Sequence, residues 1–227
     1  MCGSGKSFGD CCGTRHEERA PPYGLVVIPE YIDKALAADL VAFADQRSGA
    51  RLMVIDQHAS TPDKVVKVED PRRIAERVDL NGRRIQVNQL VKSAFVSLAK
   101  HYYGAILDWY EAPDLMRYRP GGFYIRHADS QNMHPQTGLW SKVIDRDLSL
   151  LLYLNDDFEG GEIRFHKFRY QLRPRAGMAV IFPSDHRYLH AAEMVRKGVR
   201  YAIVSWASVS GIPKIAAAPP ASALSID

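Results

Sequence analysis

The chain has 227 residues, enough to bury a substantial core, and its composition is 46% hydrophobic and 25% charged. These values are ordinary for a globular protein and argue against a disordered or collagen-like chain. Thirty lysines and arginines against 26 aspartates and glutamates leave a net charge of +4, which is too small to predict nucleic-acid binding. No apolar run approaches the ~20 residues of a membrane span, and no apolar stretch typical of a secretory signal opens the chain. We therefore expect a cytoplasmic protein without a membrane partner.

Four segments follow one another along the chain. Residues 1–19 are rich in Cys, Gly and charge, and residues 20–22 (Ala-Pro-Pro) are typical of a short stiff linker. Residues 23–210 carry the periodic apolar pattern of a folded domain. Residues 211–227 are rich in Ala and Pro, and we expect them to form a flexible tail.

The amino-terminal segment contains all the cysteines of the chain, which are Cys2, Cys11 and Cys12. Their odd, clustered count indicates reduced thiols and a metal site rather than disulfides. The stretch 3–6 (Gly-Ser-Gly-Lys) lacks the strand and upstream glycine of a P-loop, and with Phe8 and the cysteines it resembles the SEC-C zinc motif. The resemblance implies a small zinc module that could bind a protein partner.

That zinc module is incomplete. The first cysteine of the motif would precede Met1, whereas structural zinc prefers four ligands. Three explanations stay open: the chain begins late, His16 substitutes, or the module is degenerate. The plain alternative is a disordered tail of reactive thiols.

Two helices are predicted before the middle of the chain. Asp33 can cap a helix that runs to about Gln46, and a longer helix runs from about Arg84 to Tyr103, where Gly104 ends it. Apolar residues recur at helical spacing and predict one buried face on each helix. They are Leu36, Leu40, Val41 and Phe43 in the first helix, and Ile85, Leu90, Val91, Phe95, Leu98 and Tyr102 in the second.

Strands dominate the second half of the chain. One short strand, Leu25–Ile28, precedes the helices, and residues 48–80 are charged and too weakly patterned to predict an element. After Asp114, short β-type runs alternate with turn signals. The runs are Leu115–Arg119, Phe123–Arg126, Leu148–Leu154, Glu162–Phe165, Tyr170–Leu172, Ala179–Phe182 and Val199–Ala207. Helices first and short strands second predict an α+β fold with helices packed on a jelly-roll barrel.

His127 and Asp129 are the first residues that indicate chemistry. Two residues apart on a strand, their side chains point to the same face and supply half of a metal site. A second histidine far along the chain would complete a 2-His-1-carboxylate set, which binds Fe(II) and leaves coordination positions open. A His-x-Asp pair is common by itself, and the alternative is a surface pair.

Three ordered blocks around this pair resemble the prolyl 4-hydroxylase-like family of Fe(II)/2-oxoglutarate oxygenases. The blocks are Tyr118 through Gly121-Gly122 to His127-x-Asp129, then Leu151 to Glu162, and then Phe182-Pro183-Ser184 with His190 through Arg200. The resemblance covers about half of the chain. It implies that residues 23–210 form an oxygenase domain on a double-stranded β-helix barrel.

The resemblance also implies roles for individual residues. In the family, two histidines and the aspartate bind iron, and these positions correspond to His127, Asp129 and His190. A basic residue ten positions after the distal histidine binds the far carboxylate of 2-oxoglutarate, and here it is Arg200. Tyr118 matches a tyrosine that hydrogen-bonds this cosubstrate, although its ring could also simply pack in the barrel wall.

His186 competes with His190 for the distal ligand position, because Arg196 lies ten residues after it. The family register fits only from His190, however, and Arg200 falls within the last predicted strand whereas Arg196 falls in the turn before it. We therefore predict His190 as the ligand.

The segment from Ser130 to Arg146 follows Asp129 directly and shows no helical or strand period. Long irregular loops at such places are often lids or binding loops. We predict that Trp140 or His134 contacts the primary substrate. The alternative is an inert surface excursion.

The implied enzyme is a dioxygenase that uses Fe(II) and takes 2-oxoglutarate as its cosubstrate, which it converts to succinate and CO2. Ascorbate is expected as an accessory cofactor. Related halogenating enzymes lack the carboxylate ligand, so Asp129 favours hydroxylation. The resemblance suggests a prolyl or other peptidyl or amino-acid side chain as substrate. The alternative function is a non-catalytic barrel that binds a metal or ligand and acts as a sensor or partner-binding protein.

Overall fold

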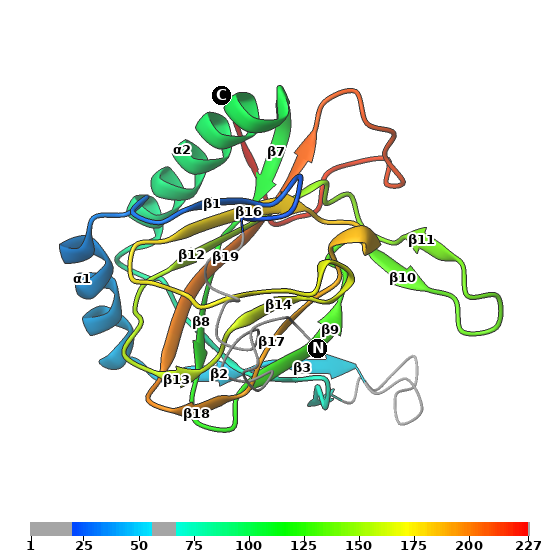
Figure 1. Ribbon diagram of the computed structural model, residues 1–227. Helices are drawn as coiled ribbons and strands as arrows, with labels where there is room; N and C mark the ends of the chain where they lie inside the picture. Colours follow the sequence, from blue (N-terminus) through cyan, green and yellow to red (C-terminus); the bar gives the residue numbers. More distant parts are fainter. Residues whose placement is uncertain (1–19, 56–66, 227) are drawn as a thin grey trace, which may run out of the picture.

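The computed structural model describes residues 20–55 and 67–226 and consists mainly of antiparallel strands (Figure 1). The largest sheet, which we call the main sheet, has nine strands, and seven of them form one continuous hydrogen-bonded row. Its order is β1 (Val26–Ile28), β16 (Ala179–Pro183), β12 (Leu148–Tyr153), β19 (Arg200–Val209), β8 (Asp114–Tyr118), β6 (Glu76–Val78) and β2 (Gly49–Arg51). Two further strands extend it beside β19, which are β7 (Leu107–Glu111) and then β20 (Ala223–Ser225).

A second sheet of five strands, which we call the minor sheet, has the order β15 (Tyr170–Leu172), β14 (Ile163–Phe165), β17 (His190–Ala192), β9 (Phe123–His127) and β5 (Arg73–Ile74). Two-stranded ribbons complete the β structure. They are β3 (Met53–Ile55) with β4 (Lys67–Glu69), β10 (Gln131–Met133) with β11 (Trp140–Lys142), and β13 (Glu159–Gly160) with β18 (Val195–Lys197). In Figure 1 the helices lie on the main-sheet side of the molecule, and the minor sheet lies on the other side.

The two predicted helices are confirmed almost to the residue. Helix α1 spans Lys34–Asp45, and the Asp33 carboxylate accepts hydrogen bonds from two amides of its first turn. Helix α2 spans Arg84–Tyr103, and Gly104 ends it in the left-handed conformation at φ 61°.

The buried face of α2 differs in part from the prediction. Val91, Phe95 and Leu98 are buried as expected, but Ile85 is 75% exposed and Tyr102 is 47% exposed. Ile85 lies two residues before the buried Val87, which places it on the opposite side of a helix with 3.6 residues per turn.

Strand alternation divides the main sheet into a helix-packed face and an open face. On β12, Leu148, Leu150 and Leu152 join the core formed with α1 and α2. Ser149 and Leu151 point the other way and line a cavity. The strands β8 and β19 alternate in the same manner, so the cavity side chains of these three strands lie on one face of the main sheet.

Strands β7, β17 and β18 fall outside the predicted runs, and two longer segments also carry more structure than their patterns predicted. The part of residues 48–80 that the structure describes contributes β2 to β6, and the segment Ser130 to Arg146 contains the hairpin of β10 and β11. These strands have two or three residues each, which is too short for a period-2 pattern to show.

The carboxyl-terminal segment, predicted as a flexible tail, is tied to the sheets instead. Strand β20 pairs with β7, and the buried Asp145 carboxylate accepts hydrogen bonds from the amides of Ile215 and Ala216. Lys214 lies 3.3 Å from carboxylate oxygens of both Asp108 and Asp147. The prediction rested on Ala and Pro content, and composition does not determine which backbone groups form hydrogen bonds with the rest of the protein.

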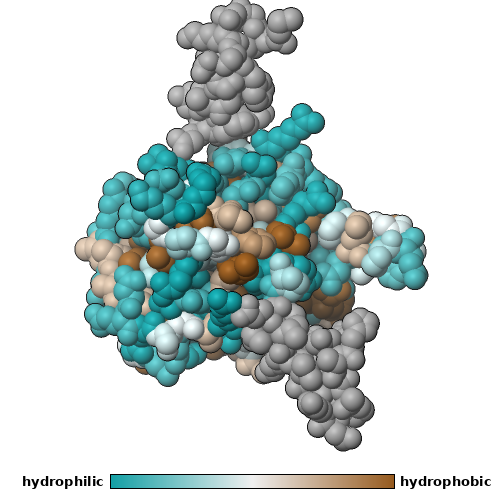
Figure 2. Space-filling view, turned by 90° about the horizontal axis from the view of Figure 1, so that it is seen from below, coloured by the Kyte–Doolittle hydropathy of each residue, from teal (hydrophilic) through white to brown (hydrophobic). Residues whose placement is uncertain are grey.

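The surface and the helices bear on the prediction that the protein has no membrane span. Seen from below the view of Figure 1, hydrophilic residues dominate the surface and hydrophobic ones gather in the middle of that face (Figure 2). Within the described residues, no helix combines the length and apolar character needed to cross a membrane.

The proposed zinc ligands Cys2, Cys11 and Cys12, with His16, lie outside the described residues, so the zinc module stays a prediction.

Candidate metal centre and cavity

Strand register brings His127, Asp129 and His190 together. His127 ends β9, His190 begins β17, and the two residues face each other across the antiparallel pair. The ligand atoms of the three side chains lie within 4.8 Å of one another. His127 Nε2 is 3.4 Å from Asp129 Oδ1, and His190 Nε2 is 3.7 Å from Asp129 Oδ2. Among the described residues, this is the only such group of three metal-ligating side chains.

Backbone carbonyls orient both imidazoles. His127 Nδ1 lies 2.8 Å from the carbonyl oxygen of Ile125, and His190 Nδ1 lies 3.1 Å from that of Tyr188. A carbonyl can only accept, so each Nδ1 carries a proton, which leaves each Nε2, on the Asp129 side, as the nitrogen that could bind a metal. Burial lowers the pKa of His190 to about 4, and His127 adds to this effect, so its ring is neutral as a ligand must be.

The Asp129 carboxylate is buried and is held by the hydroxyl group of Ser149. Burial alone would raise the pKa of Asp129, but the neighbouring His190, His127 and Ser149 outweigh it and keep this pKa well below its usual range. Ser149 Oγ donates to Asp129 Oδ2 at 2.7 Å and lies 2.7 Å from Ser184 Oγ. Ser149, on strand β12 of the main sheet, thereby positions Asp129, which follows strand β9 of the minor sheet.

The same cavity contains a buried arginine with unused donors. Arg200 begins β19 and is 3% exposed, and its Nε and Nη1 have no hydrogen-bond partner. Its Nη2 donates to the Tyr153 hydroxyl at 3.4 Å, and its Cζ lies 4.7 Å from the centre of the Tyr118 ring. Buried polar groups are nearly always paired, so two free guanidinium donors indicate a site for an anion.

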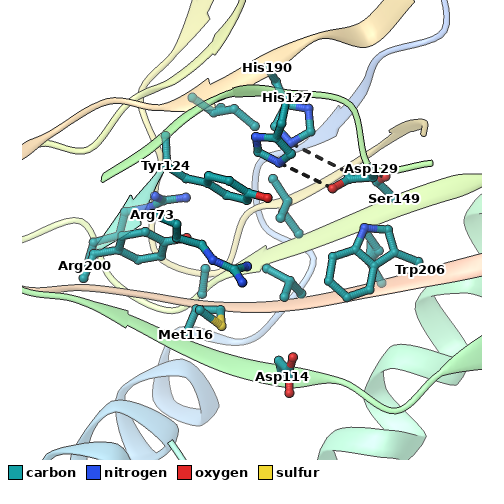
Figure 3. Close-up of a pocket in the computed structure, with 17 residues that line it drawn as sticks. Arg73, Asp114, Met116, Tyr124, His127, Asp129, Ser149, His190, Arg200 and Trp206 are labelled. Atoms are coloured by element: carbon teal, nitrogen blue, oxygen red, sulfur yellow. Dashed lines mark hydrogen bonds and ion pairs between the residues drawn. The ribbon is translucent and has the colours of Figure 1, made fainter. Parts of the chain in front are cut away.

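Figure 3 shows how these residues are arranged in one cavity. His127, His190 and Asp129 lie at the top, Arg200 lies at one side and Trp206 at the other. Arg200 and Tyr118 face each other in the register of β19 and β8. The cavity thus joins a metal-ligand set to an anion site.

The other residues considered from sequence lie elsewhere. His186 bonds to Gln131 and its ring stacks on Trp140 at 5.2 Å, outside the ligand group. Arg196 is exposed, in contrast to Arg200. Trp140 borders a surface hollow that His127 also lines.

His134 lies at the exposed turn of the β10–β11 hairpin, where its carbonyl oxygen accepts from the Gly138 amide at 2.9 Å. The structure therefore brings Trp140, but not His134, close to the proposed metal ligands.

Sequence reasoning missed several residues of the cavity. They are Arg73, Asp114, Met116, Tyr124, Ser149 and Trp206, and Tyr153 behind Arg200 was missed as well. Strand parity could have found some of them, because Ser149 and Tyr153 share the side of Leu151 on β12. Arg73 lies in the weakly patterned region and carried no such signal.

Comparisons with known proteins agree with this geometry. Residues 113–208 match the sequence profile of the 2OG-Fe(II) oxygenase superfamily. This match covers less than half of the 227-residue chain. The matched segment contains the three ligand candidates and Arg200.

Similar curated proteins include prolyl 3-hydroxylase 3 of Mus musculus, which is 39% identical over 89 residues, or 35% of this chain. A PKHD-type hydroxylase of Synechococcus sp. (strain CC9902) is 38% identical over 71 residues, which is 30% of this chain and 31% of that protein. The chain spans only 12% of the length of the prolyl 3-hydroxylase.

Solved structures show a similar fold at low sequence identity. A prolyl hydroxylase of Trichoplax adhaerens, in complex with a hypoxia inducible factor peptide fragment, has a TM-score of 0.61 at 17% identity and covers 82% of this chain and 84% of that one. A viral collagen prolyl hydroxylase of Paramecium Bursaria Chlorella virus-1 has a TM-score of 0.56 at 16% identity and covers 83% of this chain and 98% of that one. The similarity in fold therefore extends well beyond residues 113–208.

The residues present are chemically suited to Fe(II) and 2-oxoglutarate. Two neutral imidazoles and one carboxylate are the donor set of non-haem Fe(II) oxygenases. The unpartnered donors of Arg200 offer two parallel hydrogen bonds to a carboxylate.

Proposed function

We propose that this protein is an Fe(II)- and 2-oxoglutarate-dependent dioxygenase that hydroxylates a prolyl or other peptidyl or amino-acid side chain. The observation that carries the proposal is the coexistence of the His127, Asp129 and His190 group with the unpaired guanidinium of Arg200 in one cavity. The similarity to prolyl hydroxylases supports the substrate class. We also propose that the two sheets form the double-stranded β-helix, or jelly roll, of this superfamily.

Each residue of the cavity has a defined task in this proposal. His127 Nε2, His190 Nε2 and an oxygen of Asp129 would hold the iron, and Arg200 would bind the far carboxylate of 2-oxoglutarate. Bound together, the metal and the cosubstrate supply the oxidising chemistry that turns O2 and 2-oxoglutarate into succinate, CO2 and a hydroxyl group on the substrate.

The protein's own contribution is orientation and exclusion of water. The carbonyls of Ile125 and Tyr188 hold the imidazoles, and the Ser149 hydroxyl holds Asp129 ionised and turned toward them. The Tyr118 and Tyr153 rings flank Arg200, so its charge is buried and interacts strongly with a bound carboxylate.

Succinate formation tests the proposal. The full chain with Fe(II), 2-oxoglutarate and ascorbate should form succinate and CO2, faster in the presence of a proline-containing peptide that gains one oxygen atom by mass spectrometry. Binding of Fe(II) and 2-oxoglutarate with no succinate, alone or with any peptide of the panel, would support the rival function of a non-catalytic sensor.

A separate proposal concerns the amino terminus. The SEC-C resemblance supports zinc binding by Cys2, Cys11 and Cys12, and through it contact with a protein partner. Replacement of Cys11 and Cys12 by Ser should lower the zinc content of the purified protein and leave iron binding unchanged. Equal zinc in both proteins would contradict it.

A further inference from the structure

Arg73 is a cavity residue that has no task in the function proposed above. It begins β5 at the edge of the minor sheet and pairs in register with Tyr124 of β9. Its Cζ lies 4.7 Å from the centre of the Tyr124 ring, and it lines the same cavity as His127 and Arg200 (Figure 3). The minor sheet therefore presents a second guanidinium to the site.

This guanidinium has an unmet hydrogen-bonding need. Arg73 Nε is buried and has no hydrogen-bond partner, and a buried donor left without a partner is destabilising. Burial raises the pKa of Asp114, another cavity carboxylate, although Arg77 and Arg73 oppose that rise, and its Oδ1 is already paired with Arg77 at 3.5 Å. Asp129 is oriented toward the two histidines. The cavity thus contains more positive than negative charge available to a ligand.

Arg73 lies close to the proposed metal ligands. The Tyr124 ring that it contacts also stacks on the His127 imidazole, with 3.6 Å between ring centres and an interplanar angle of 18°. The Arg73 Cζ is therefore no farther from the His127 ring centre than these two short distances combined. A group bound by Arg73 would therefore lie beside the proposed metal ligands.

The cosubstrate does not need this arginine. Arg200 has two unpartnered donors, Nε and Nη1, which match both oxygens of one carboxylate. The two arginines also belong to different sheets, because Arg200 extends from β19 of the main sheet. A second anionic group is the ligand that Arg73 can accept.

We propose that Arg73 binds a carboxylate of the primary substrate, so that the favoured substrates carry an acidic group beside the carbon that is hydroxylated. This inference rests on the proposed oxygenase function and names its substrate class. The carboxylate could belong to a free amino acid or to an acidic side chain next to the modified residue of a peptide. Both sources offer the same planar anion to the guanidinium fork.

Matched pairs of probes test the inference. One pair is L-proline and L-prolinamide, and the other is a blocked peptide with aspartate after proline and the same peptide with asparagine. In the Fe(II)- and 2-oxoglutarate-loaded full chain without O2, calorimetry should show at least tenfold tighter binding of the acidic member of one pair. With O2, that member should have the correspondingly lower KM, and the pair that discriminates identifies the source of the carboxylate.

Variants connect this preference to Arg73. Arg73→Met should remove the preference for the acidic probe while leaving the 2-oxoglutarate requirement unchanged, and Arg73→Lys should retain part of it. Arg119→Met is the matched control, because Arg119 is 55% exposed and is paired with Glu76. A circular-dichroism melt of each variant shows whether it is folded.

Three results would overturn the inference. They are equal binding of the acidic and neutral members of both pairs, a preference that survives in Arg73→Met, and a raised 2-oxoglutarate requirement in Arg73→Met. If the wild-type chain forms no succinate under any condition, the proposed function fails. The anaerobic binding measurement still decides the role of Arg73 in that case.

Discussion

The two walls of the cavity are built differently. The main-sheet wall consists of long central strands, such as the ten-residue β19, and contributes Arg200, Tyr118 and Ser149. The minor-sheet wall consists of strands of two to five residues and contributes His127, His190 and Arg73. The main-sheet residues are supported by a packed helical layer, whereas the minor-sheet residues depend on cross-strand pairs, ring stacking and turns.

This difference indicates a division of tasks. The side of the cavity that would recognise the invariant cosubstrate lies on the well-supported wall. The side that would bind the metal and the primary substrate lies on the wall with shorter strands. Substitution of Arg200 and substitution of minor-sheet residues should therefore affect different measured quantities, with Ser149, which bonds to Asp129, as the main-sheet exception. Five predictions test this separation.

The largest effect should follow removal of a minor-sheet ligand. His190→Ala should abolish 2-oxoglutarate turnover and lower iron content, because the remaining two ligands cannot hold the metal on one face. Iron analysis and succinate assays measure this. His186→Ala is the control, since His186 stacks on Trp140 outside the ligand group. Full activity of His190→Ala with loss in His186→Ala would show that the ligand assignment is wrong.

Arg200→Ala should affect the other wall selectively. Loss of one partner of a buried charged pair typically costs ~2–5 kcal/mol, so the 2-oxoglutarate requirement should rise at least tenfold. Iron binding should stay largely intact, which titration with a metal chelator can check. Arg196→Ala, an exposed control in the middle of β18 rather than on the predicted turn, should leave the requirement unchanged. A strong loss of iron in Arg200→Ala would mean that the two walls are not separable.

Acid should destabilise the metal-free protein through His190. Its pKa is about 4 in the folded state and 6.5 as the ordinary value, so the unfolded chain binds the proton first as the pH falls. The free energy of unfolding should fall by roughly 3 kcal/mol between about pH 7 and pH 4 from this group. Urea unfolding after chelation measures the loss, and His190→Gln should show a smaller one. Identical pH profiles would contradict the buried, neutral state of this ring.

Ser149→Ala should show how far the main sheet controls the metal ligands of the other wall. A hydrogen bond to a charged group contributes about 1.5–3 kcal/mol, so Fe(II) affinity should fall by roughly tenfold or more. The 2-oxoglutarate requirement at saturating iron should change little. Ser205→Ala is the matched control, because Ser205 is a buried main-sheet serine that donates to the Glu111 carbonyl instead. An unchanged iron affinity would remove Ser149 from the positioning role.

The smallest effect is expected at Trp140, beyond the edge of the minor-sheet wall. Trp140→Ala should lower substrate-coupled turnover by about threefold, a size typical of a peripheral contact, and leave uncoupled decay of 2-oxoglutarate nearly unchanged. His134→Ala serves as the comparison at the exposed hairpin turn. An equal fall of both rates in Trp140→Ala would assign the residue to support of the fold rather than to substrate contact.

Much of this site could be predicted from sequence, for identifiable reasons. Helices α1 and α2 carry a capping Asp33 and a terminating Gly104, which are local signals. The three motif blocks contain the whole ligand group and Arg200, because those residues lie at characteristic spacings within short segments. The short strands β2 to β6, the β10–β11 hairpin and the docked carboxyl terminus left no comparable trace.

The sequence by itself determined the helices, the strand-rich second half and the chemical identity of the residues around His127 and His190. Only the tertiary structure decided which distant residues share the cavity. Ser149 of the main sheet bonds to Asp129, which follows a strand of the minor sheet. Arg73 lines the same cavity, although it comes from a segment whose sequence has no clear helical or strand period. The physical reason is that periodicity and capping arise from contacts within a few residues. The register between β5 and β9, by contrast, depends on the packing of the whole chain.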